Sequence, residues 1–499
     1  MSISFNTIPS GIRVPLFYAE MDNSAAYTPT NTSQSLLIGQ KLESGTAEEG
    51  VPVTVSTVAM AKKLFGRGSM LARMVDAYRT VDSFGQLVCI PLADGQSAGA
   101  AAGKVEITGT ALEAGTLSFY IGGERLQVAV KEGDTGAQIA IALSDSISLS
   151  KDLPVTAGAA DADGICTIAA RTKGTIGNGI QFALNLRGLI NGEATPSGIS
   201  VTTTPMSGGT VDPEIDQAIE AMGDEQYDFI GCPYSDAVVL DAFKTEMNDT
   251  SGRWSPFRQI YGHVYTAKRG TLEELKTFGA ARNDQHMTIV GVEPSMPTAV
   301  EEVLAAYVAR TAVFISADPA RPTQTGALTG VMASPTQNRF ILTERQTLLE
   351  NGIATLTTVS GTVQIERAIT TYQRNSMGDA DASYLDSETL HTSAYVLRRL
   401  KSIITSKYAR HKLASDGTRY GAGQAIVTPS VIRGELVAEY ARLETAGICE
   451  NRDLFKKYLI VERNADNPNR LDVLFPPDYV NQLRVFALLN QFRLQYAEE

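Results

Sequence analysis

The sequence predicts an α/β protein whose core carries an inserted β-rich domain and is followed by an α+β C-terminal domain. Three observations lead to this prediction. Short apolar strands alternate with amphipathic helices on both sides of residues 98–206, which is typical of a mostly parallel sheet covered by helices. Residues 98–206 instead contain successive strands separated by turn residues. A long helix near residues 384–413 then introduces the last part of the chain.

The first part of the core begins with a predicted strand, SLLIGQ, at residues 35–40. Residues 59–80 predict a short helix, a break at Gly66 and Gly68, and a longer helix with its apolar residues on one face. LVCIPLAD at residues 87–94 predicts a buried strand. Together these elements give the core its first two strands and the helices between them.

The inserted domain lies between two segments rich in small residues, DGQSAGAAAG (94–103) and SGGT (207–210), which predict hinges. Apolar residues alternate through 117–130 around Gly122–Gly123, and this pattern predicts a hairpin. DTGAQIAIALSDSI predicts a capped helix within the same domain.

From Asp212 onward, helices and strands alternate again. The first helix has Pro213 at its start. A Ser360–Gly361 turn predicts a hairpin within residues 353–373. The other predicted core helices cover residues 236–247, 271–282, 298–314 and 336–352, with Asn351–Gly352 as a C-cap, and the strands cover 227–234, 258–267 and 287–293.

The C-terminal part begins with the helix predicted at 384–413. A second helix is predicted at 429–447, and strands are predicted at 458–463, 470–475 and 483–496. Within the first helix, the stretch 398–412 is basic and contains no acid; its cations are Arg398, Arg399, Lys401, Lys407, Arg410 and Lys412.

Composition excludes several classes of protein. The net charge of −12 argues against nucleic-acid binding driven by overall charge. The four cysteines are far apart and predict neither a zinc site nor a disulfide framework. The N-terminus lacks the pattern of a signal peptide, and no apolar run is long enough to span a membrane. We therefore expect a soluble protein made in the cytoplasm.

The densest cluster of potentially reactive side chains is Asp379, Asp381, Asp386, Glu388 and His391. The spacing does not match a calcium-binding EF-hand loop, and the single Glu-x-x-His pair has no second copy, as a di-iron site would require. A capping box formed by Ser383 and Asp386 at a helix N-terminus explains the cluster better. A metal site and an acid/base centre stay open as less favoured alternatives.

No other motif indicates catalysis or cofactor binding. GxSxG, HExxH and GxxxxGK[ST] do not occur, and none of the four histidines lies in a glycine-rich serine context. The sequence therefore predicts no catalytic residue, no metal ligand and no cofactor. For the basic stretch 398–412, a solvated helix face and a protein partner with acidic patches are the favoured interpretations, with nucleic acid as a third.

Several runs, taken together and in order, resemble contractile tail sheath proteins of bacteriophages, and most of all the sheath family of phage Mu and its prophage relatives. The longer runs are IPSGIRVPLFYAEMDNS, LFGRGSMLARMV, GTLSFYIGGERLQVAV, DPARPTQTG, ITTYQRN, SYLDSETLHTSAYVLRR and LRVFALLNQFRL. LLIGQ and IPLADG complete the set, which spans nearly the whole chain.

The resemblance implies a subtilisin-like core without the catalytic triad, formed by residues 26–97 with 207–370. It implies a variable outer domain at 98–206 and a C-terminal domain at 371–481 that faces the tail tube, where the basic helix would contact an acidic surface. It also implies arms at 1–25 and 482–499 that add strands to neighbouring subunits. The arm residues are Arg13, Val14, Leu16, Phe17 and Tyr18, then Val485, Phe486, Leu488, Leu489, Phe492 and Leu494.

The implied function is structural. Rings of the protein, which the resemblance implies are hexameric, would stack around the tail tube and contract to drive it through the host envelope for genome ejection. The expected partners are further copies of the chain, the tube protein, and baseplate and tail terminator proteins, with no nucleic acid and no membrane insertion. The sheath would be assembled in the host cytoplasm and belong to the virion tail. An α/β serine hydrolase and a surface-lattice or adhesive protein stay open as alternatives.

Overall fold

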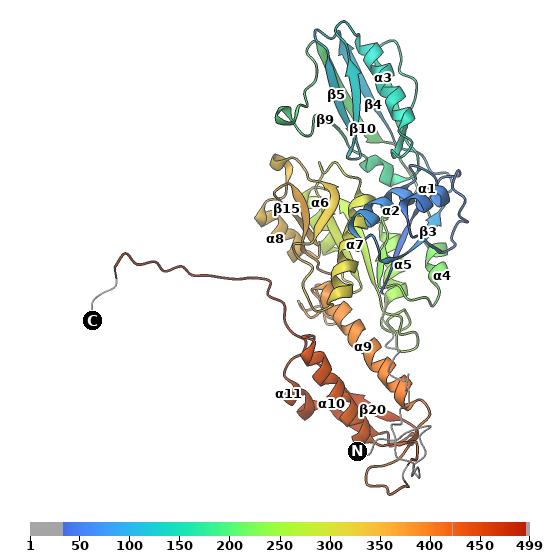
Figure 1. The fold of residues 1–499 in the computed structure, drawn as a ribbon, viewed down its shortest axis with the longest axis vertical. Coiled ribbons are helices and arrows are strands. Elements are labelled where there is room, and N and C mark those ends of the chain that lie inside the picture. The colour runs from blue at the N-terminus through green and yellow to red at the C-terminus, as the bar shows by residue number, and fades with distance from the viewer. Residues whose placement is uncertain (1–32, 422, 496–499) are drawn as a thin grey trace, which may run out of the picture.

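The computed structural model describes residues 33–421 and 423–495. The molecule is elongated, with the inserted domain at one end, the α/β core in the middle and the C-terminal domain at the other end (Figure 1). Three hydrophobic clusters occupy these parts. The largest cluster runs from Leu36 to Ala368, the second from Ala101 to Met206, and the smallest from Val396 to Leu459.

The core is built on a six-stranded sheet in the order β13-β12-β11-β1-β3-β2. Every neighbouring pair is parallel except β2 with β3, which is antiparallel. Parallel strands buried on both faces are apolar throughout, and this explains runs such as LLIGQ. The strands are β1 (Gln34–Gln40), β2 (Val53–Thr54), β3 (Gln86–Leu92), β11 (Phe229–Gly231), β12 (His263–Arg269) and β13 (Met287–Val292).

Helices cover this sheet, and α2 packs against both β1 and α7. The predicted break between the first two helices is confirmed, because Gly66 and Gly68 have φ of 88° and 80°, which favours glycine. The helix predicted to start at Pro213 begins only at Asp216. The core helices are α1 (Val58–Phe65), α2 (Met70–Val81), α4 (Asp216–Met222), α5 (Ala237–Met247), α6 (Leu272–Ala280), α7 (Val300–Ala317) and α8 (Leu342–Glu350).

A second, three-stranded sheet with the order β14-β16-β15 completes the core. Its hairpin turns at Ser360 and Gly361, as predicted. Its third strand, β14, was not predicted from the sequence. The strands are β14 (Ala327–Met332), β15 (Thr355–Val359) and β16 (Thr362–Arg367). The subtilisin-like topology expected for the core stays a prediction.

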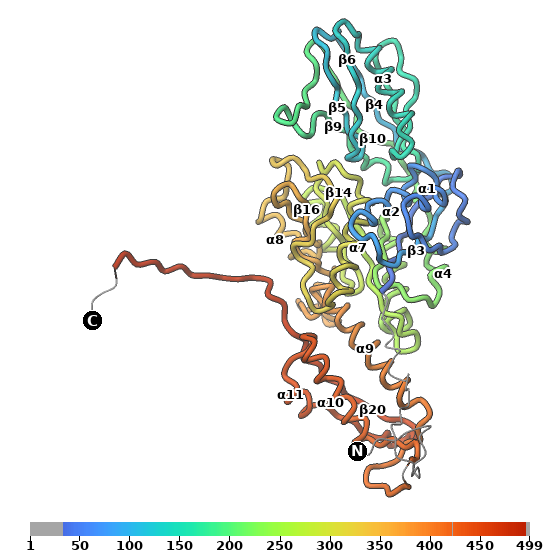
Figure 2. The backbone as a smooth tube through the Cα atoms, in the orientation of Figure 1, coloured from blue at the N-terminus to red at the C-terminus, as the bar shows by residue number. Residues whose placement is uncertain are grey.

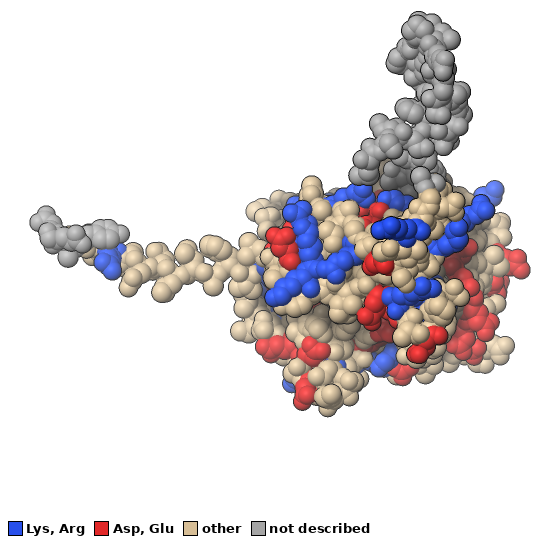
Figure 3. Space-filling view, turned by 90° about the horizontal axis from the view of Figure 1, so that it is seen from below, with Lys and Arg blue, Asp and Glu red and all other residues tan. Residues whose placement is uncertain are grey.

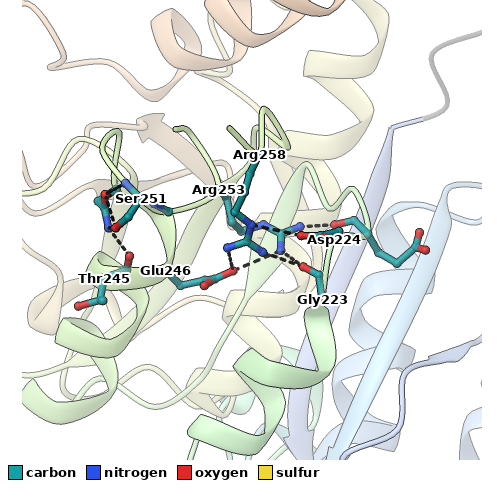
Figure 4. Close-up of polar contacts among 10 residues, drawn as sticks. Gly223, Asp224, Thr245, Glu246, Ser251, Arg253 and Arg258 are labelled. Atoms are coloured by element: carbon teal, nitrogen blue, oxygen red, sulfur yellow. Dashed lines mark hydrogen bonds and ion pairs between the residues drawn. The ribbon is translucent and has the colours of Figure 1, made fainter. Parts of the chain in front are cut away.

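The loop that joins α5 to β12 is held by two arginines (Figure 4). Arg253 is fully buried and donates through Nη1 to the carbonyl of Gly223 at 2.8 Å. Arg258 donates to the same carbonyl at 2.9 Å and to Glu246 Oε1 at 2.9 Å. Because both cations point at the same acceptors, the buried charge is compensated and the loop is fixed to the core.

The inserted domain consists of two antiparallel sheets, one α-helix and two short 3-10 helices. Its hairpin turns at Gly122 and Gly123, and its helix starts at a capping box formed by Thr135 and Gln138. The sheets have the orders β10-β4-β8-β7 and β6-β5-β9. The elements are β4 (Ala102–Gly109), β5 (Gly115–Ile121), β6 (Glu124–Val130), α3 (Gly136–Leu149), β7 (Val155–Ala157), β8 (Ile165–Ala170), β9 (Phe182–Leu184) and β10 (Ile199–Ser207).

The two segments predicted as hinges of this domain are braced by hydrogen bonds. Gly99 and Thr210 form an antiparallel bridge between them. Asp94 accepts a hydrogen bond from Gln40 Nε2 at 2.7 Å, and Asp212 accepts one from the Thr175 amide at 2.7 Å. The small residues therefore allow two chain segments to approach each other closely.

Helix α9 connects the core to the C-terminal domain (Figures 1 and 2). The predicted helix 384–413 is shorter than expected, because residues 412–413 pair with 426–427 as strands. The strand predicted at 483–496 is absent from its described part, 483–495, where no neighbouring strand is in place. The elements are α9 (Ser387–Tyr408), β17 (Lys412–Leu413), β18 (Ile426–Val427), α10 (Pro429–Thr445), α11 (Arg452–Tyr458), β19 (Ile460–Arg463) and β20 (Leu471–Leu474).

Candidate functional site at the junction of the core and the C-terminal domain

The first turn of α9 is buried against the loop that joins α7 to β14. Glu388, in this turn, is fully buried. Its Oε1 atom accepts hydrogen bonds from the backbone amide of Thr323 at 2.9 Å and from the Thr323 hydroxyl at 2.7 Å. We call this loop, residues 318–326, the junction loop. A buried carboxylate with such partners fixes the helix start to the core.

Asp386, one residue before α9, has a different role from the one predicted. Its side chain makes no capping hydrogen bond to the helix. Instead it binds Arg367 through two hydrogen bonds of 2.9 and 3.0 Å, and these raise the pKa of Arg367. Ser383 donates to Asp381 at 2.9 Å. The capping box is therefore wrong, because α9 begins at Ser387, so that Ser383 lies three residues before the N-cap, and Asp386 binds the Arg367 guanidinium instead.

Arg484, near the end of the chain, joins this group of carboxylates. Its Nη2 atom lies 3.1 Å from Glu388 Oε2 and 3.3 Å from Asp386 Oδ1. Its Nη1 atom donates to Gln324 on the junction loop at 3.3 Å. Only 11% of the Arg484 side chain is exposed. One guanidinium thus connects the chain end, the start of α9 and the core.

The chain crosses from the C-terminal domain to the core within two residues. The amide of Val480 donates to the carbonyl of Ile448 in the C-terminal domain at 3.1 Å. The side chain of Gln482 then donates to the carbonyl of Ala320 on the junction loop at 2.8 Å. Thr392 on α9 donates to Pro319 of the same loop at 2.8 Å. The junction loop therefore binds both segments that connect the two domains.

His391 lies deeper in the junction, one helical turn from Glu388. Its Nε2 atom is 2.7 Å from the hydroxyl of Tyr265, and its ring centre is 5.6 Å from that of His263. Burial, aided by the charge of Arg398, lowers the pKa of His391 to about 3. The imidazole is therefore neutral at physiological pH and acts as a packed hydrogen-bonding group.

Two of the other histidines, His263 and His286, are also packed within the core. His263 contacts the Thr288 hydroxyl at 2.8 Å, and His286 lies 3.0 Å from Asp249 and stacks on Trp254. Residues 33–421 and 423–495 contain no group of three His, Cys, Asp or Glu side chains arranged to hold a metal ion. In the same part of the chain, no helix has the length and apolar character that crossing a membrane requires.

Beyond Arg484 the chain leaves the body of the molecule as an extended segment (Figures 1 and 2). Its large apolar side chains are 75% to 96% exposed. They are the predicted arm residues Val485, Phe486, Leu488, Leu489, Phe492 and Leu494. The arm residues predicted near the N-terminus, Arg13 to Tyr18, lie outside the described residues.

A two-stranded sheet in the C-terminal domain has exposed edges and exposed apolar side chains. In this sheet β19 pairs only with β20 among the described strands. Ile460 of β19 is 49% exposed, and its partner Leu474 of β20 is 57% exposed. Leu454 and Tyr458 of α11 are also more than half exposed. This surface combines unpaired strand edges with apolar side chains.

The basic stretch 398–412 divides into two groups in the structure. Three of its cations pair with acids of the same chain: Arg398 lies 2.5 Å from Asp228, Arg399 binds Glu439, and Lys407 lies 2.6 Å from Glu435. The absence of acids within the stretch was therefore misleading, because other elements supply them.

The second group consists of exposed cations in the second half of α9 and in the segment that follows it, which includes β17. Among the described residues, none of these side chains forms an ion pair. They are Lys401, Arg410 and Lys412, together with Arg419, which was not predicted. We call these four residues the cationic tip. Figure 3 views this end of the molecule, where Lys and Arg side chains gather in several places.

The roles of Arg367, Thr323 and Arg484 were not predicted from the sequence. A signal was nevertheless present, since these residues lie in or next to runs that carry the family resemblance. DPARPTQTG is the junction loop, SYLDSETLH starts α9, and LRVFALLNQFRL contains Arg484. The structure brings these distant runs together at one junction.

Comparisons with known proteins agree with this resemblance. A family model described as phage tail sheath protein central domain matches residues 208–371, and one described as phage tail sheath C-terminal domain matches residues 379–493. The Mu-like prophage FluMu tail sheath protein of Haemophilus influenzae is 42% identical over 497 residues, which cover 99% of this chain and 100% of that protein.

One solved structure shares the fold at low sequence identity, and a second is similar over most of the chain. The sheath tail protein of Desulfitobacterium hafniense matches with a TM-score of 0.50 and 11% identity, covering 94% of this chain and 97% of that chain. The sheath tail protein of Listeria innocua matches with a TM-score of 0.49 and 12% identity, covering 92% and 94%.

Proposed function

Since this chain belongs to the phage tail sheath family and is a structural protein of a phage-like contractile tail, we propose that its copies are linked by their C-terminal arms. The observation that carries this proposal is the extended segment after Arg484, with six large apolar side chains at least 75% exposed. Burying one such side chain is worth about 1.5–3 kcal/mol. The arm therefore has a strong tendency to bind another surface.

The acceptor we propose is the β19–β20 sheet of a neighbouring copy. A strand added at its edge satisfies backbone groups of both chains and covers the exposed side chains of Ile460 and Leu474. The N-terminal arm, residues 1–25, would add a strand in the same way. Because an arm and its acceptor are different surfaces, such contacts propagate into rings and helices. The family suggests six copies per ring.

The cationic tip is the part of the C-terminal domain that we propose faces the tail tube. Its four exposed cations fit an acidic partner surface and would help to hold the extended sheath in place. Charge reversal at Arg398 or Arg399 would break ion pairs inside the chain. The cationic tip therefore provides the cleaner test of this contact.

Contraction would proceed by rotation of the domains while the arms stay paired with their neighbours. The energy would be stored in the interfaces between copies, and the extended lattice would persist kinetically. The sheath would drive the tube through the host envelope without nucleotide hydrolysis.

The further partners of the sheath would be baseplate and terminator proteins. Assembly would take place in the host cytoplasm before the sheath becomes part of the virion tail. We propose that residues 26–97 with 207–370, 98–206 and 371–481 act as the three domains.

Electron microscopy of the purified chain with its tail tube tests this function. We expect striated hollow tubes. Discrete particles that react with a serine-directed probe would favour the hydrolase alternative, and a flat lattice would favour a surface-layer or adhesive protein. Deleting residues 1–20 should leave a folded monomer that forms no sheath, and normal sheaths from this variant would exclude donation by the N-terminal arm.

A further inference from the structure

The C-terminal domain is an excursion of the chain that leaves the core and returns to it at one place. The chain leaves through α9, whose Glu388 binds the junction loop. It returns through residues 480–484, where Gln482 binds the carbonyl of Ala320 on the same loop. Arg484 then links the returning segment directly to Glu388 at the departure point.

We infer that Arg484 and Glu388 form a clamp that closes the base of the C-terminal domain, so that a pull on the C-terminal arm passes to the core and bypasses that domain. This inference rests on the proposed role of the arm as a link between copies. The inference specifies where a pull from a neighbouring copy enters the subunit. It assigns Arg484 as the residue that positions the start of the arm.

The contacts at the clamp suit it to carrying load. The Glu388 side chain is fully buried and that of Arg484 is 11% exposed, so solvent screens their attraction weakly. Gln324 adds two contacts from the core, accepting from Arg484 at 3.3 Å and donating to the Leu483 carbonyl at 3.5 Å. Breaking a buried pair on one side is expensive because the partner charge stays buried.

The C-terminal domain is less suited to carrying load. Its hydrophobic cluster is much smaller than the core cluster that contains Leu36 and Ala368. Without the clamp, a pull on the arm would pass through Gln482 to the segment 475–480. This segment is fixed to the C-terminal domain, for example by the amide of Val480, which donates to the Ile448 carbonyl, and by the packing of Tyr479, so the pull would load that smaller cluster. With the clamp, the arm that leaves the molecule begins at residue 485.

The test compares Arg484→Met with Arg321→Met in the full-length chain. Arg321 is an exposed arginine on the same junction loop, so its loss controls for removal of one positive charge. Hydrogen exchange is measured on the unassembled proteins. We expect Arg484→Met to speed exchange about tenfold at the amide of Thr323, which donates to Glu388, with residues 448–450 unchanged. Unaltered exchange at Thr323 would overturn the clamp.

The mechanical part is tested on assembled sheaths by the urea concentration at which half of them contract. Arg484→Met should lower this concentration, Arg321→Met should leave it unchanged, and adding Glu388→Gln to Arg484→Met should change little more, because the pair is already broken. Contraction of Arg484→Met sheaths at the wild-type concentration would overturn the load path. If the arm does not link copies, chains that lack residues 485–499 will form normal sheaths. The hydrogen-exchange result for the clamp would still hold in that case.

Discussion

Arg484, at the root of the C-terminal arm, lies 3.1 Å from Glu388, a fully buried carboxylate in the first turn of α9. This pair joins the last segment of the chain to the helix that connects the core with the C-terminal domain. It also explains the dense group of acids that precedes and begins α9, because two of them hold arginines from other elements.

Glu388→Ala should lower the free energy of unfolding by about 3–5 kcal/mol, since it leaves the Arg484 charge buried without its main partner and removes both acceptor bonds to Thr323. Urea unfolding measures this loss. Glu462→Ala serves as the control because Glu462 is exposed on β19. A loss below about 1 kcal/mol for Glu388→Ala would show that the clamp adds little stability.

Stability should fall as the pH falls through the range set by His391. Its pKa is about 3 in the folded protein and 6.5 in the unfolded chain, so the unfolded state binds the proton first as pH falls below 6.5. Each pH unit within this range therefore removes up to about 1.4 kcal/mol of stability for this histidine. Burial also lowers the pKa of His263, which adds to the effect.

The check is to measure the free energy of unfolding at several pH values for the wild type and for His391→Gln, which keeps a side chain able to hydrogen-bond to Tyr265. The variant should show a shallower decline below the unfolded pKa. Identical pH profiles for the two proteins would contradict the assignment of a buried, neutral His391.

Reversing the cationic tip should affect tube binding and leave folding intact. Replacing Lys401, Arg410, Lys412 and Arg419 by glutamate should abolish tube-dependent polymerisation, and a single reversal should weaken it more at low salt than at high salt. Arg399→Glu should instead destabilise the monomer, because it places a carboxylate beside buried Glu439. Pelleting with tubes and thermal unfolding separate the two effects, and unchanged pelleting of the fourfold variant would exclude an electrostatic tube contact.

Two glycines within helices should respond oppositely to alanine. A Cβ atom at Gly279 of α6 would lie 2.1 Å from the carbonyl oxygen of Asn351, so Gly279→Ala should destabilise the core by more than about 1 kcal/mol. Gly434 of α10 has open space around it, so Gly434→Ala should stabilise the protein by about 0.5–1 kcal/mol. Urea unfolding of both variants tests these signs, and equal shifts would contradict the packing of α6 against the turn after α8.

The α/β alternation of the core and the hairpins at Gly122–Gly123 and Ser360–Gly361 were predictable from the sequence because they rest on local periodicity and turn residues. Strand β14 and helix α11 were missed. The basic helix was misread in part because the acids that pair with Arg398 and Arg399 lie on distant elements. The capping box failed for the same reason, since Arg367 lies on the preceding hairpin.

The predicted C-terminal strand shows a further limit of predicting structure from sequence. Residues 483–495 have the apolar character of a strand, but a strand forms only when a partner edge is present. The segment is therefore extended and has no neighbouring strand among the described residues, although its sequence pattern is that of a β-strand. In the sequence, the parts of the junction appear only as separate family-like runs. The junction loop, α9 and Arg484 are distant in the sequence and meet only in the folded chain.

The most direct test of the account is electron microscopy of chains that lack residues 485–499, mixed with tail tubes beside the full-length protein. Truncation after Arg484 keeps the clamp and removes only the free arm. We expect a folded monomer with unchanged thermal unfolding that forms no sheath on tubes. Striated sheaths of wild-type length from the truncated chain would contradict the claim that the C-terminal arm links neighbouring copies.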